Sequence, residues 1–166
     1  GMPLAMLIVA EAPPMYEFVD RDVSQQQEGV RLLVWGMRRW VGAAREGRCI
    51  CRFLVSIFQT AGAPKAAEPL ANAMRILVNN VSTPVRFGAI DYPTILEHEA
   101  VLLGALRTAA AGRIDECQAI ARLLVHADMA PALASSLVRL AEVLNEADVH
   151  LAAQDEAAGP GGSGRP

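Results

Sequence analysis

At 166 residues the chain is long enough for one domain whose hydrophobic core needs no disulfide or metal to hold it together. Its net charge of −3 argues against a nucleic-acid-binding protein, and its longest apolar runs fall far short of the ~20 residues that a membrane-spanning helix requires. We therefore expect neither a nucleic-acid partner nor a membrane partner.

Three segments differ in composition. Residues 1–14 are apolar but lack the basic start of a secretion signal, so we expect them to form the N-terminal arm of a cytoplasmic protein. Residues 15–152 carry a helical pattern and are predicted to form a single domain. Residues 153–166 are rich in Gly and Pro, and we expect a disordered tail there.

The first half of the chain predicts three helices. Ser24 and Gln27 fit a capping box, and an apolar stripe follows at three- and four-residue steps. Gly47 is expected either to end this helix or to bend it. A second helix is predicted from about Ile50 to Gly62, and a third from Pro64 or Lys65 to Thr83-Pro84.

A long connection, residues 83–93, precedes the second half. Thr94 and Glu97 fit another capping box for a fourth helix, which should end at Gly112. A fifth helix is expected from Ile114 to Ala127. The sixth follows Pro131 and carries leucines in a 4-3-4 repeat. Five or six helices with mostly short links predict an all-α fold, an antiparallel helical bundle.

Arginines are concentrated in the first half of the chain, where residues 21–65 have a net charge of +5 and the remainder −8. If the first two helices were continuous, four arginines spaced by seven would share one face. With their flanking residues they form the predicted partner-binding set: Arg31, Trp35, Arg38, Arg39, Arg45 and Arg52. An acidic protein partner fits this surface. The alternative is that the arginines pair with acidic residues of the later helices, Glu99 among them.

The connection at 83–93 exceeds the usual two to eight residues between bundle helices, and so it is a candidate lid over a ligand pocket. The predicted lining residues are Asn79, Asn80, Arg86, Phe87 and Tyr92.

The three cysteines are candidate metal ligands or reactive thiols. Cys49 and Cys51 could bind a metal with Cys117, His98 or His126 only if the backbone turned between the two thiols, and the spacing is atypical for zinc. A thiol enzyme is a further alternative, with Arg48 and Arg52 lowering a thiol pKa. We predict no metal and no cofactor.

The excess of apolar residues, 52% with a mean hydropathy of +0.25, predicts surface covered by a second copy of the chain. The leading functional hypothesis is therefore a non-enzymatic helical protein-interaction module that forms a homodimer. The alternative is a bundle that binds a small ligand or a metal in a pocket under residues 83–93.

Overall fold

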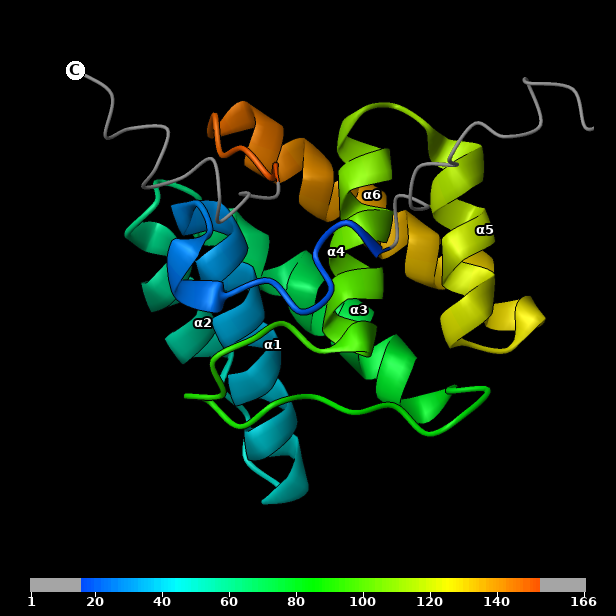
Figure 1. Cartoon of the computed structure of the whole chain (residues 1–166), viewed down its shortest axis with the longest axis horizontal. Helices are drawn as coiled ribbons and strands as arrows, with labels where there is room; N and C mark the ends of the chain where they lie inside the picture. The colour runs from blue at the N-terminus through cyan, green and yellow to red at the C-terminus, as the bar shows by residue number, and fades with distance from the viewer. Residues whose placement is uncertain (1–15, 153–166) are drawn as a thin grey trace, which may run out of the picture.

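The computed structural model of the chain describes residues 16–152 and confirms the all-α bundle, with six α-helices and no strand within that range (Figure 1). The helices are α1 (Glu28–Arg45), α2 (Cys51–Gln59), α3 (Ala67–Asn79), α4 (Glu97–Ala110), α5 (Ile114–Leu124) and α6 (Ala130–Glu146). Short 3-10 segments, η3 (Val23–Gln25), η4 (Pro64–Ala66) and η5 (Ala127–Met129), precede α1, α3 and α6. The predicted arm at 1–14 and the predicted disordered tail at 153–166 lie outside the described residues.

Gly47 ends α1, so the first two helices are separate. Its φ of +72° is a left-handed conformation that glycine adopts without a steric penalty. The Gly47 N–H donates to the Ala44 carbonyl (3.1 Å) and the Arg48 N–H to the Ala43 carbonyl (2.9 Å), which is the Schellman pattern of helix termination. Gly112 ends α4 in the same way, as predicted.

Both predicted capping boxes were wrong. Ser24 lies in η3, where its N–H and hydroxyl donate to the Asp22 carboxylate, and α1 begins only at Glu28. At α4 the N-cap is Leu96 rather than Thr94, so Glu99 takes the third helical position, and its carboxylate accepts a hydrogen bond from the Leu96 N–H (2.9 Å). Glu99, not Glu97, is therefore the acid that caps the helix.

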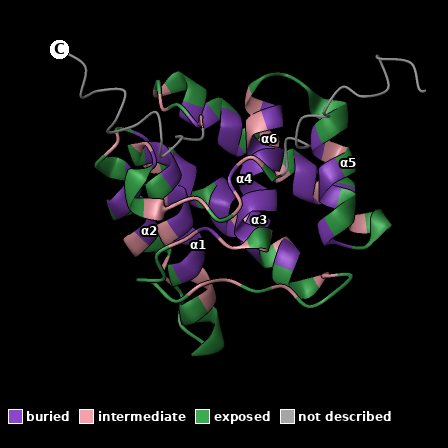
Figure 2. Cartoon of the chain, viewed as in Figure 1, coloured by how far each residue is buried: buried purple, intermediate pink, exposed green. Residues whose placement is uncertain are grey.

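Helix α4 is the central element of the bundle. Ten of its fourteen residues are buried, because α5, α6 and α1 contact it from different sides (Figure 2). The predicted leucines of α6, at 133, 137, 140 and 144, are all buried in the same core. Within residues 16–152 no helix combines the length and the apolar character needed to cross a bilayer.

The connection between α3 and α4, residues 80–96, is held to the body at both ends. At its start, the His126 N–H donates to the Asn80 carbonyl (3.0 Å). At its end, the Asp20 N–H donates to the Ile95 carbonyl and the Ile95 N–H donates to the Arg21 carbonyl (both 2.9 Å). The middle of the connection runs across the lower part of the molecule beside α1 (Figure 1).

Candidate binding groove

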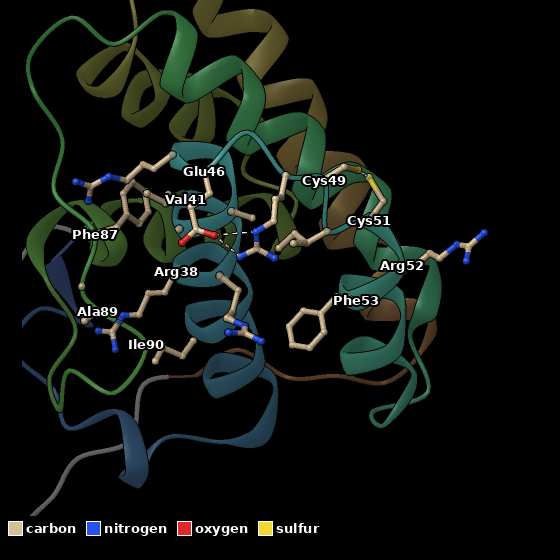
Figure 3. A pocket seen from close by; sticks show the side chains of 17 residues that line it. Arg38, Val41, Glu46, Cys49, Cys51, Arg52, Phe53, Phe87, Ala89 and Ile90 are labelled. Carbon is tan, nitrogen blue, oxygen red and sulfur yellow. Dashed lines mark hydrogen bonds and ion pairs between the residues drawn. The ribbon is translucent and has the colours of Figure 1, made fainter.

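An open groove of about 860 Å³ lies on the described part of the chain, and we call it the arginine groove. It lies between the second half of α1, the linker 46–50, the first turn of α2 and residues 87–90 of the long connection (Figure 3). Phe53 and Phe87 stand on opposite sides of it (Figure 3). Five arginines and one glutamate line the groove, so its character is basic with apolar walls.

Arg38 is not available to a partner, which corrects its assignment as a partner-binding residue. Its side chain is 1% exposed and forms a bidentate ion pair with Glu99, which is 0% exposed. The Arg38 Nε lies 2.8 Å from Oε2 of Glu99, and Nη2 lies 2.9 Å from Oε1. The pairing of first-helix arginines with acids of the later helices therefore holds for this one arginine.

The Arg38–Glu99 pair also fixes the long connection. Arg38 donates from Nη1 to the Tyr92 carbonyl (2.7 Å) and from Nη2 to the Thr94 carbonyl (2.9 Å). Glu99 in turn accepts a hydrogen bond from the Gly88 N–H at 2.8 Å. Because Glu99 accepts four hydrogen bonds and Arg38 donates four, the burial of the pair is compensated, and residues 87–90 are held as one wall of the groove.

Gly88 lies so close to Arg38 that even a methyl side chain would fit tightly. A Cβ built on it would lie 3.0 Å from the Cζ, Nε and Nη2 atoms of Arg38. Any other residue would therefore need the Arg38 guanidinium to shift by a few tenths of an ångström.

Arg39 points toward the opposite wall. Its guanidinium carbon lies 4.5 Å from the centre of the Phe53 ring and 6.0 Å from that of Trp35. The two rings meet edge to face, with centroids 5.6 Å apart. Trp35 is thus half-buried in a contact within the chain, and the Arg39 charge has aromatic neighbours but no carboxylate partner among the described residues.

The remaining arginines differ in whether a partner within the chain neutralises their charge. Arg48 pairs with Glu46 at 2.7 Å, both exposed. Arg45 and Arg52 are exposed and make no ion pair or hydrogen bond within residues 16–152. Arg52 lies at the rim and points away from the groove (Figure 3). Arg31 lies outside the groove and donates to the Gln26 carbonyl. Since α1 ends at Gly47, the four arginines spaced by seven do not form one stripe.

The predicted ligand-binding residues do not gather in one place. Phe87 lines the arginine groove, whereas Asn79 and Asn80 donate to carbonyls of their own helix, those of Arg75 and Ile76. The other two, Arg86 and Tyr92, are exposed; the Arg86 N–H donates to Nδ1 of His98 at 3.1 Å. The concavity lies at the side of the connection, toward α1 and α2, rather than beneath it.

The thiols of Cys49 and Cys51 lie at the edge of the groove with their sulfurs 3.0 Å apart (Figure 3). Cys117 is buried in α5 and is not part of this pair; burial raises the pKa of its thiol. No three His, Cys, Asp or Glu side chains of residues 16–152 are grouped in a way that could hold a metal.

Sequence reasoning missed two features of the groove. One is the contribution of Ala89 and Ile90, which carry no chemical signal in the sequence. The other is the burial of Arg38: Glu99 was one of several acids that could pair with the arginines, but the sequence did not indicate which arginine it would bury. Comparison with known proteins adds no relative: no protein-family model, curated protein or solved structure matches the chain.

Proposed function

We propose that the protein is a non-enzymatic interaction module that binds an acidic segment of a partner protein in the arginine groove. The observation that carries the proposal is the uncompensated charge of Arg39 and Arg45, with Arg52 at the rim, beside a concavity with aromatic walls. Arg38 is neutralised by Glu99 and Arg48 by Glu46, which leaves Arg39 and Arg45 in the groove, and Arg52 at its rim, without a carboxylate among the described residues.

The chemistry of the groove favours an acidic peptide with an apolar side chain. Guanidinium groups bind carboxylates through paired N–H donors, and the Phe53 and Phe87 rings offer apolar surface between them. Charge complementarity of this kind determines which partner is recognised and how fast it associates more than it determines affinity.

We also propose that the protein forms a homodimer in the cytoplasm, and native mass spectrometry of the purified protein tests whether it is a dimer.

The choice of substitution follows from the burial of Arg38. Reversing its charge would place two carboxylates together in the core and unfold the protein, so it cannot report on binding. Arg45 and Arg52 are exposed and unpaired within the described residues, and replacing them leaves the core contacts intact. The informative variant is therefore Arg45→Glu combined with Arg52→Glu.

The test is fluorescence anisotropy with a fluorescein-labelled, glutamate-rich peptide that contains a central phenylalanine. We expect saturable binding to the wild-type protein and a Kd at least about tenfold higher for Arg45→Glu/Arg52→Glu. The matched control is Arg122→Glu/Arg139→Glu, which makes the same change in net charge on the exposed faces of α5 and α6.

Equal loss of binding in the control variant would mean that overall charge, not the groove, attracts the peptide. Binding that survives the reversal at Arg45 and Arg52 refutes the proposal. Displacement of the bound peptide by inorganic phosphate or citrate at equal concentration would instead identify the groove as a small-anion site. We also expect binding to weaken strongly with salt, since the screening length falls from about 10 Å at 0.1 M to about 3 Å at 1 M ionic strength.

A further inference from the structure

The two neighbouring cysteines are brought together by the break between α1 and α2. On a continuous helix, side chains two residues apart diverge by about 200°. Here Gly47 ends α1, and α2 begins at Cys51, so Cys49 lies outside the helix while Cys51 is its first residue. Ile50 between them has φ −117° and ψ 25°, a non-helical conformation that turns the Cys49 side chain back. The result is a distance of 3.0 Å between the two sulfurs.

The distance is suited to a bond between the sulfurs. A disulfide requires about 2.05 Å between the sulfur atoms, so a movement of roughly 1 Å, within reach of side-chain rotation, joins them. Both residues are exposed, and neither contributes to the hydrophobic core. The pair therefore has access to a reactant, and its oxidation leaves the bundle in place.

The two thiols are chemically different. A hydrogen bond from the Cys51 thiol, together with the Cys51 backbone N–H and the charge of Arg75, holds the pKa of Cys49 below its ordinary value. The same thiol–thiol contact raises the pKa of Cys51, and desolvation adds to it. Cys49 is thus the more reactive thiol, because the thiolate is the attacking species, and Cys51 is placed to act second.

We propose that Cys49 and Cys51 form a redox-active dithiol that exchanges with a low-molecular-weight disulfide at the edge of the arginine groove. This activity goes beyond the proposed peptide binding and does not depend on it. The supporting observations are the convergence of the two sulfurs, their exposure, and the backbone break that produces the contact.

The exchange proceeds in two displacements. The Cys49 thiolate attacks one sulfur of the substrate disulfide; a bond forms between them, the substrate S–S bond breaks, and the released thiolate takes up a proton. The Cys51 sulfur, on losing its proton, then attacks Sγ of Cys49 and expels the second substrate sulfur as a thiolate, which takes up that proton. The protein loses two electrons and two protons, and the substrate disulfide gains them as two thiols.

Oxidised glutathione is the probe, added to the reduced full-length protein and followed by mass spectrometry after acid quench. We expect the wild-type chain to lose two hydrogen atoms, with Cys49 and Cys51 joined in one peptide, and to recover them on addition of reduced glutathione. Cys117 is the internal control and should stay a free thiol, because it is buried. The Cys51→Ser variant should accumulate glutathione on Cys49.

The Cys49→Ser variant should accumulate glutathione on Cys51, because no second thiol remains to displace it. A wild-type product that retains glutathione, a disulfide between two chains, or no reaction would each overturn the proposal. Failure of either single variant to take up glutathione would also overturn it. Circular dichroism confirms that the variants are folded, which we expect because both side chains are exposed.

Discussion

Replacing Glu99 by glutamine tests whether the buried ion pair holds the long connection against α1. The carboxylate accepts four hydrogen bonds: two from Arg38, one from the Gly88 N–H and one from the Leu96 N–H. A glutamine keeps the shape of the side chain but carries one NH₂ group, which would face two of these donors, and it leaves the buried Arg38 charge uncompensated.

The expected loss of stability follows from the number of hydrogen bonds that the substitution removes. Two lost bonds to a charged group correspond to about 3–6 kcal/mol, in agreement with the ~3–5 kcal/mol observed when one partner of a buried ion pair is removed. In a folded body of this size that lowers Tm by about 10 °C or more. Urea denaturation, monitored by circular dichroism, measures the change in the free energy of unfolding. The control is Glu97→Gln, two residues away on the same helix and exposed, for which we expect less than about 1 kcal/mol.

A double-mutant cycle separates the pair from its surroundings. Arg38→Met combined with Glu99→Leu should cost less than the sum of the two single substitutions, because no unpaired charge remains in the core. If Glu99→Gln costs less than about 1 kcal/mol, or if the double variant equals the sum of the singles, the ion pair does not stabilise the connection as argued here.

The remaining predictions concern backbone positions. Gly88→Ala should destabilise the protein by about 1–3 kcal/mol, because the added methyl group meets the immobilised Arg38 guanidinium at 3.0 Å. Gly42→Ala is the contrasting control: nothing lies within 4 Å of its Cβ position in α1, so we expect a gain of about 0.5–1 kcal/mol. Asp148 follows α6 with φ 60°, where the Val149 N–H donates to the Leu144 carbonyl (2.8 Å) in a Schellman pattern. Asp148→Gly should therefore stabilise by about 0.5–1 kcal/mol, since it relieves the left-handed conformation and removes an anion from a helix C-terminus. Asp148→Asn should gain less. Urea unfolding measures all four, and a neutral Gly88→Ala or a destabilising Asp148→Gly would contradict the respective argument.

The fold could be predicted because helical periodicity is a local property of the sequence. The leucines of α6 and the glycine after α4 lie where the pattern placed them, since each depends only on neighbours within a few turns. The helix starts were less accurate. Ser24 and Thr94 have the right residue type for a cap, but backbone hydrogen bonds between residues 20–23 and 93–95 hold these two segments against each other, and neither helix begins there.

The site was harder to predict, because it depends on which side chains meet across the bundle. The arginine spacing of seven suggested one exposed stripe, yet Arg38 is buried and Arg52 belongs to another helix. Whether Gly47 ends or bends a helix cannot be decided from the local pattern alone. Because Gly47 ends α1, the arginines spaced by seven do not form one stripe, and Cys49 comes to lie next to Cys51. The groove also depends on the path of residues 87–90, which is set by a contact with Glu99 that lies eleven residues beyond Gly88.

The most direct test of the proposed function is an NMR titration of the ¹⁵N-labelled protein with the glutamate-rich peptide. We expect the largest amide shifts on the second half of α1, the linker 46–50, the first turn of α2 and residues 87–90. Resonances of α5 and α6 should stay unchanged. Shifts centred on α5 and α6, or no shifts at a peptide concentration that saturates anisotropy, would contradict the assignment of the arginine groove as the binding site.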